Sequence, residues 1–232
     1  METIIEIDRK SMLANFSLRK ATKDDINFVI EAIIEAEKGC SNQISTCSIF
    51  ALSEDEYKEI LRDILIQDIE HFDYYLSGYL IAESNGLYIG AYGSWLEGAE
   101  GISSGIIRSS VLFPYLDKSK ISEINKNTKI ISGITIPREA GALQIEYVYI
   151  RKQFRGKGVF SQVVKENISR NLLKYNFSKV QSILFKDNIR SYNAFSKLGY
   201  KIVEERSVNE PDILKYFPYN TKVLMELRKD RF

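Results

Sequence analysis

The residues of this chain whose types and spacing best fit a chemical task form a basic turn, Gln153-x-x-Gly156-x-Gly158, with Arg155 and Lys157 between the named positions. Glycines let the backbone approach a ligand closely. If a helix begins directly after the turn, its first N–H groups are free to donate to an anion, and the basic side chains attract the same anion. The pattern therefore predicts a phosphate-binding turn.

A strand before this turn and a helix after it would hold it in place. Residues Leu143–Ile150 are apolar, aromatic or β-branched, which is typical of a buried strand. After the turn, apolar residues recur at helical spacing: Val159, Phe160, Val163, Val164, Ile168 and Leu172. The segment lacks the Gly-Lys-Ser/Thr sequence of a P-loop and the three glycines of a dinucleotide fingerprint. The alternative is a basic surface turn before an ordinary helix.

Length and composition describe one globular domain. The 232 residues are 44% hydrophobic and 27% charged, and this length can bury a full core. We expect a single domain over residues 1–232. The net charge of +1 argues against a nucleic-acid partner or an acidic membrane surface. No apolar run is long enough for a membrane span.

The cysteine and histidine content predicts a protein without a structural metal. Cys40 and Cys47 are too far apart for a CxxC motif, and His71 is the only histidine. The first ten residues are acidic and mixed, without the apolar core of a secretory signal. We therefore expect a cytoplasmic protein with reduced cysteines.

Two helices are indicated before the central segment. Thr22 and Asp25 form a capping box for a helix that ends before Gly39, and Ser53 and Glu56 form a second one. The polar face of the second helix is acidic. It is interpreted as a solvated surface rather than as a cradle for a cationic acceptor.

The remaining strands are indicated by alternation and turn residues. Asn85-Gly86 predicts a hairpin between two of them, and the predicted strands are 16–21, 79–84, 87–95, 179–185, 200–206 and 222–227. Residues 97–142 are interpreted as an insertion that adds a strand, covers an acceptor site or forms a dimer contact. The aromatic loop 211–220 either lines a binding site or fixes itself to its own domain.

A second sequence block follows the predicted helix after the turn. It reads N-x-x-S-x-x-x-F-x-K-L-G-Y, from Asn188 through Ser191 and Phe195 to Tyr200. The two blocks together resemble the GNAT N-acetyltransferase superfamily. The resemblance covers residues 143–205 well, the first helix loosely and residues 97–142 not at all. It implies an α/β (α+β) fold with a mixed, mostly antiparallel central sheet flanked by helices, and an insertion before the central strand.

The resemblance also implies acetyl-CoA as the cosubstrate. The strand ending at Ile150 should splay from the strand beginning near Val180, and the pantetheine arm should pair with the backbone there. The implied cofactor-binding residues are Val148, Tyr149, Ile150, Arg155, Gly156, Lys157, Gly158, Val159, Phe160, Asn188, Ser191 and Phe195.

Catalysis in this family implies direct attack of an amine on the thioester. A backbone N–H near Val148 would stabilise the oxyanion. Glu146, expected to alternate onto the face of Val148 and Ile150, is the predicted base, and a structural ion pair is the alternative for it. The family commonly has a tyrosine acid where this chain has Phe195. Tyr192, one turn earlier, is predicted to replace it, with a plain core role as the alternative.

The sequence thus predicts a cytoplasmic N-acetyltransferase that acts on a primary amine of an unidentified small molecule or protein, with neither nucleic acid nor membrane as a partner. Neither the acceptor nor the preferred acyl-chain length follows from the two blocks. The alternative is an acyl-CoA-binding regulatory or sensor module that has lost catalysis, because Phe195 has no proton to give.

Overall fold

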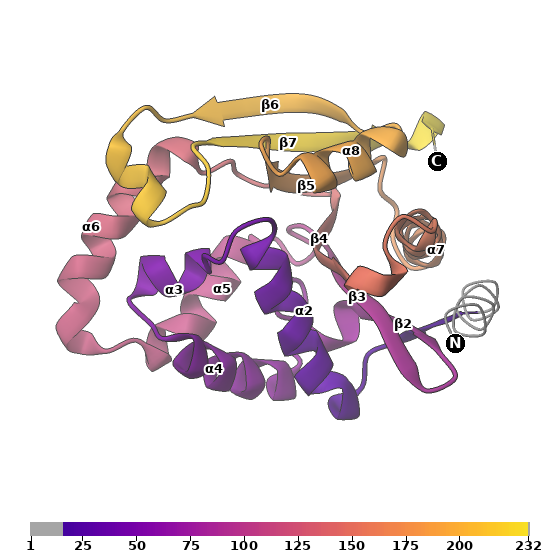
Figure 1. The fold of residues 1–232 in the computed structure, drawn as a ribbon, viewed down its shortest axis with the longest axis horizontal. Helices are drawn as coiled ribbons and strands as arrows, with labels where there is room; N and C mark the ends of the chain where they lie inside the picture. Colours follow the sequence, from indigo (N-terminus) through magenta and orange to yellow (C-terminus); the bar gives the residue numbers. More distant parts are fainter. Residues whose placement is uncertain (1–15, 232) are drawn as a thin grey trace, which may run out of the picture.

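The computed structural model describes residues 16–231, so the expectation drawn from the first ten residues lies outside it. Seven strands form one sheet in the order β1-β2-β3-β4-β5-β7-β6 (Figure 1). All neighbours are antiparallel except β4 and β5, which are parallel. The predicted mixed, mostly antiparallel sheet is confirmed. The strands are β1 (Ser17–Lys20), β2 (Tyr79–Ser84), β3 (Leu87–Leu96), β4 (Leu143–Ile150), β5 (Lys179–Phe185), β6 (Lys201–Ser207) and β7 (Thr221–Arg228).

Helices cover both faces of the sheet. The helices α7 and α8 bury their apolar residues against one face, and α2, α4 and α5 pack against the other. We call these the α7 face and the α2 face. The helices are α2 (Ile26–Lys38), α3 (Ser45–Phe50), α4 (Glu54–Gln67), α5 (Ser104–Leu112), α6 (Ile121–Ile131), α7 (Val159–Leu172) and α8 (Ile189–Lys197).

The helix starts follow the predicted caps. Ser53 Oγ accepts a hydrogen bond from Glu56 N at 3.2 Å, and the Glu56 carboxylate accepts from Ser53 N at 2.7 Å. The box of Thr22 and Asp25 is also present, although it caps a 3-10 turn that leads into α2. The acidic residues on the polar face of α4 are exposed to solvent, as expected. Within residues 16–231, no helix is long and apolar enough to cross a membrane.

The predicted hairpin joins β2 to β3. Asn85 and Gly86 occupy its turn with φ values of 51° and 74°. Both values are positive, which is what a two-residue turn of type I′ requires. The hairpin places β3 beside β4, the strand that leads into the basic turn.

The insertion, residues 97–142, contains two helices, and no strand forms between α5 and α6. The helix α5 packs through Leu112 into the core of the α2 face. The helix α6 contacts α3 and the 3-10 helix Pro211–Lys215, beside a smaller core that contains Ile134 and Phe217. Figure 1 shows α6 along one side of the molecule, between the level of α4 and that of β6. The insertion therefore packs against two cores: α5 contributes to the core of the α2 face, and the segment around α6 contributes to the smaller core beside β6.

The aromatic loop before β7 is fixed to this smaller core. Phe217 is buried in it, and Tyr216 Oη donates a hydrogen bond to Asn127 Oδ1 of α6 at 2.8 Å. The loop therefore packs against its own domain, which was one of the two interpretations of its aromatic residues.

Candidate active site

The basic glycine turn lies at the N-terminus of α7. Gly158 immediately precedes the helix with φ 81°, and Gly156 has φ 75°. A Cβ added at either glycine would meet no heavy atom within 4 Å. The turn is therefore not filled by neighbouring side chains, and the free N–H groups at the start of α7 remain accessible to an anion.

The basic side chains of the turn have two different environments. Arg155 folds back, and its Nε donates to the carbonyl of Ile150 at 2.7 Å. Lys152 and Lys157 are exposed and make no ion pair within residues 16–231. Two lysines are thus available to a ligand of the turn, whereas Arg155 orders the end of β4.

The strands β4 and β5 separate next to this turn. Their parallel pairing consists of Leu143 with Val180 and Gln144 with Gln181. Beyond these two pairs, β4 continues against β3 and β5 continues against β7. The expected splay is confirmed, and residues 145–150 have no registered partner on the β5 side.

Strand β4 also contains a β-bulge. Its pairing with β3 shifts by one residue between Ala91 and Gly93, and Tyr147 has a left-handed φ of 52°. Two residues of β4, Tyr147 and Val148, therefore lie opposite the single residue Tyr92. A bulge redirects side chains and leaves backbone groups unpaired, which makes it a frequent feature of functional sites.

The bulge reverses the expected orientation of Glu146. Through β3, Glu146 is in register with Tyr79 of β2, which is buried on the α2 face. Val148 and Ile150 pack on the α7 face instead. The expectation that Glu146 shares a face with Val148 and Ile150 is wrong, because the extra residue of the bulge breaks the alternation.

Glu146 is held by an arginine from the insertion. Arg138 Nε and Nη2 donate to the two carboxylate oxygens at 2.9 and 2.8 Å, and its guanidinium lies 5.1 Å from the centre of the Trp95 ring. Burial acts to lower the pKa of Arg138, but Glu146 more than offsets this effect, and the pKa lies above its ordinary value. The ion pair named as an alternative is thus present, and the role of Glu146 as a base stays a prediction.

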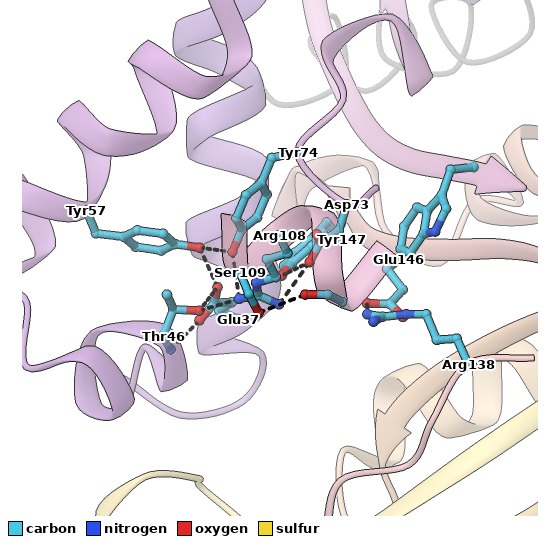
Figure 2. Close-up of polar contacts among 12 residues, drawn as sticks. Glu37, Thr46, Tyr57, Asp73, Tyr74, Arg108, Ser109, Arg138, Glu146 and Tyr147 are labelled. Carbon is cyan, nitrogen blue, oxygen red and sulfur yellow. Dashed lines mark hydrogen bonds and ion pairs between the residues drawn. The ribbon is translucent and has the colours of Figure 1, made fainter. Parts of the chain in front are cut away.

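A polar cluster on the α2 face is centred on Arg108 of α5 (Figure 2). Arg108 Nη1 donates to Asp73 Oδ2 at 2.9 Å, and Nη2 donates to Tyr74 Oη at 2.8 Å and to Thr46 Oγ1 at 3.1 Å. Burial acts to lower the pKa of Arg108, but Asp73 and the nearby tyrosines raise it further, so the guanidinium stays charged. We call the following residues the polar cluster: Glu37, Thr46, Tyr57, Asp73, Tyr74, Arg108 and Tyr147.

Glu37 is the second carboxylate of the polar cluster, and its partners are neutral. It accepts from Thr46 N at 2.9 Å, Thr46 Oγ1 at 2.8 Å and Tyr57 Oη at 2.7 Å. Tyr57 Oη and Tyr74 Oη lie 2.8 Å apart and link it to Arg108. No cation pairs with Glu37 within the described part of the chain.

Asp73 has one oxygen to spare. Its Oδ2 accepts from Arg108, and Tyr147 Oη lies 3.4 Å from it. Asp73 as a whole is only 1% exposed, and its Oδ1 is buried without a hydrogen-bond partner among residues 16–231. Buried carboxylate oxygens are normally satisfied, so this atom is suited to accept from a ligand.

Lys222 of β7 lies on the other side of the strand divergence. Its Nζ is 3.8 Å from the centre of the Phe217 ring and 5.0 Å from that of Phe185. Burial lowers its pKa to about 8, and the negative charge of Glu146 acts in the opposite direction.

The predicted residues of α8 lie on the α7 face. Asn188 Oδ1 accepts from Ser191 N at 3.3 Å and caps the helix, as expected. Phe195 is 4% exposed and packs edge-on against Phe160 and Tyr200, at 5.1 and 5.0 Å between ring centres. Tyr192 is half-buried against the same cluster. The structure therefore places Tyr192 and Glu146 on opposite faces of the sheet, with their catalytic roles still predictions.

The charged residues of the α2 face were not singled out from the sequence. Asp73, Arg108, Arg138 and Lys222 come from four separate segments, and no spacing links them. Lys222 gave no clear signal either, because it shares its strand face with the charged residues Glu226 and Arg228.

Comparison with known proteins places this geometry in a fold family. No protein-family model matches the chain, and no curated protein sequence matches it significantly. The structure is similar to an N-acetyltransferase from Staphylococcus aureus Mu50, with 11% identity, coverage of 91% of this chain and 100% of the other, and a TM-score of 0.59.

Two further solved structures agree. A GNAT-family acetyltransferase from Streptococcus agalactiae 2603 has 15% identity, coverage of 92% and 95%, and a TM-score of 0.51. The aminoglycoside acetyltransferase AAC(6')-Ib, solved in complex with coenzyme A, has 15% identity, coverage of 94% and 97%, and a TM-score of 0.51. With its two diverging parallel strands and the glycine turn beside them, the chain has the GNAT fold.

Proposed function

We propose that the protein is an N-acetyltransferase that moves the acetyl group of acetyl-CoA to a primary amine. One observation carries the proposal: β4 and β5 separate after two paired residues, directly beside an open glycine turn at the N-terminus of α7. A fold alone does not select a function. This combination, however, offers a free strand edge and an anion site at one place, and CoA has both an extended amide-containing arm and a diphosphate.

The backbone supplies most of the cofactor site. The pantetheine arm pairs with Val148, Tyr149 and Ile150, which lie beyond the last pair with β5. The carbonyl of Ile150 already accepts from Arg155, and its second lone pair is available. The diphosphate accepts from N–H groups of residues 155–160 at the positive end of α7, with Lys157 beside it.

The reaction forms a C–N bond and breaks a C–S bond. The neutral amine attacks the thioester carbonyl, and a backbone N–H released by the bulge near Val148 donates to the oxyanion. Before the attack, Glu146 takes a proton from the ammonium form of the acceptor, directly or through a water; after it, the tetrahedral intermediate loses a second N–H proton to solvent and CoA leaves as the thiolate. Both Glu146 oxygens accept from Arg138 and each keeps a lone pair for this proton.

Protonation of the leaving thiolate does not involve Phe195, which is buried among aromatic rings and has no hydroxyl group. Tyr192 carries the nearest hydroxyl on the same helix stripe and is our candidate for the acid. A thiolate of ordinary acidity leaves without much assistance, so turnover does not depend strictly on this proton.

Calorimetric titration with CoA and acetyl-CoA tests the cofactor site. Gly156→Val and Gly158→Val place a β-branched residue at positive φ in the turn, and we expect each to weaken CoA binding by about tenfold or more, since each also narrows the approach of the diphosphate. Gly101→Val is the matched control, because Gly101 has φ 78° and open surroundings in a different loop. Equal effects at all three positions would contradict the proposed site.

A screen of amines with detection of the released thiol tests catalysis. Acetyl-CoA binding together with amine-dependent thiol release supports the enzyme. Binding without release on any amine supports a regulatory module that has kept only the cofactor site.

A further inference from the structure

Lys222 is a cation of the α2 face without a charged partner among residues 16–231. Glu146 is paired with Arg138, and Asp73 is paired with Arg108. The ammonium group of Lys222 makes no hydrogen bond or ion pair within residues 16–231, and it lies over the rings of Phe185 and Phe217. Charges withdrawn from water are normally paired, so an unpaired ammonium on aromatic rings is suited to receive an anion from outside the chain.

Strand register places Lys222 on the same face as Glu146. Lys222 is paired with Phe185, and Phe185 has the same parity on β5 as Gln181. Gln181 accepts a hydrogen bond from Gln144 at 3.1 Å across the last paired residues of β4 and β5. Gln144 and Glu146 in turn share a face, because the bulge begins only after Glu146. Glu146 and Lys222 therefore stand on either side of the strand divergence.

The two sides of the divergence differ in whether their charges are paired. On the β4 side, the carboxylates of Glu37, Asp73 and Glu146 outnumber the guanidinium groups of Arg108 and Arg138. This side also holds the unsatisfied Oδ1 of Asp73. On the β7 side, Lys222 lies over two aromatic rings, and Glu226, which has the same parity on β7, accepts hydrogen bonds from Gln181 and Arg228. Besides burial, Glu146 and Glu37 act to raise the pKa of Lys222, and Arg138 and Arg108 act to lower it.

We propose that the acceptor carries an anionic group in addition to its amine, and that Lys222 binds this group while the amine lies towards Asp73 and Glu146. The preferred acceptors are zwitterionic amines, such as amino acids or amines bearing a phosphate. Polyamines are disfavoured, because their second cation would meet Lys222. That the acceptor has an amine rests on the proposed function. That it also has an anionic group rests on Lys222 alone.

The first test compares acceptors that differ only in the anion. An amino acid is compared with its amide, and phosphoethanolamine with ethanolamine, using kcat/KM from thiol release. We expect the charged member of at least one pair to be favoured by about tenfold or more, since a charge-assisted hydrogen bond is involved. The two pairs distinguish a carboxylate from a phosphate. Equal rates within both pairs, or a diamine as the best acceptor, would overturn the proposal.

Variants of Lys222 give the second test. Lys222→Met should remove the preference for the charged member by raising its KM, and Lys222→Arg should retain most of it, since it keeps the positive charge. Lys201→Met, at an exposed position of β6, is the matched control. A preference that survives in Lys222→Met would assign the anion to another residue and refute the proposal.

A third measurement does not require turnover. Calorimetry with N-acetylalanine and with phosphoethanolamine, on wild type and Lys222→Arg, reports the anion site even if Lys222→Met does not fold. Binding of one probe that is weakened when the other probe is added, in wild type and in Lys222→Arg alike, supports a shared anion site formed by a cation at position 222. Binding of neither probe to wild type rejects the site. A separate titration with CoA reports the cofactor site, so failure of the proposed function and failure of this inference give different results.

Discussion

The glycine turn and the polar cluster are built in different ways, although both flank the same pair of diverging strands. The turn consists of consecutive residues, and its ligand-binding groups are backbone N–H groups at a helix start. The polar cluster brings together side chains from α2, α3, α4, α5 and β4 and from the segment between α4 and β2. A backbone site tolerates changes of most side chains, whereas a side-chain site depends on each member. Cofactor binding and acceptor choice should therefore respond to different mutations.

The largest expected effect comes from removing the centre of the polar cluster. Arg108→Met leaves Asp73 buried without its cation, and such a loss costs about 3–5 kcal/mol of unfolding free energy. Arg62→Met is the control, because Arg62 is a surface residue with a long ion pair to Glu59, and it should cost less than about 1 kcal/mol. Urea unfolding measures both. Similar costs for the two variants would mean that the polar cluster contributes nothing special to stability.

The CoA affinity of Arg108→Met sharpens the same comparison. The glycine turn lies on backbone that Arg108 does not contact, so CoA binding should change by less than about twofold in the folded variant. Calorimetry below the unfolding temperature provides the measurement. A large loss of CoA affinity would show that the two regions are coupled.

A smaller effect is expected from the predicted base. Glu146→Gln should lower kcat/KM by about a hundredfold at neutral pH, the contribution typical of a general base, without changing CoA affinity. The deficit should shrink at high pH, where the acceptor amine is already neutral. A pH–rate profile identical in shape to that of wild type would leave Glu146 with only its ion pair to Arg138.

A change in stability smaller than that of Arg108→Met concerns the pH dependence at Lys222. The pKa is about 8 in the folded protein against an ordinary 10.5, so the unfolded chain binds more protons between these values. The stability of wild type relative to Lys222→Met should therefore rise as the pH increases from 8 to 10.5. We expect a rise of about 1–2 kcal/mol, because the ammonium is only partly withdrawn from water. Denaturant unfolding over this pH range, with Lys201→Met as a flat reference, measures it. A constant difference would show that Lys222 is not desolvated.

The regions built from consecutive residues were predictable from the sequence. Alternation, helical spacing and caps predicted β4, α7, the hairpin at Asn85-Gly86 and the cap of α8 at Asn188. In each case one short segment contains the whole signal. The splay of β4 from β5 was also expected, but only through the resemblance carried by the two sequence blocks.

The remaining features depend on contacts between distant segments. The bulge at Tyr147 has no glycine to indicate its positive φ, so simple alternation gave the wrong face for Glu146. The helices of the insertion have few buried residues, which weakened their periodicity. The pairing of Arg138 with Glu146 and of Arg108 with Asp73 follows only from the three-dimensional fold.

The divergence of β4 and β5 leaves two strand edges inside the sheet instead of at its rim. Free edges invite association with a foreign polypeptide, and proteins usually protect them at the periphery. Here helices lie over both faces, so another chain cannot approach these edges sideways. If CoA binds as proposed, its thin, flexible arm with amide groups enters end-on, and the fold thereby separates recognition of a small ligand from the hazard of self-association.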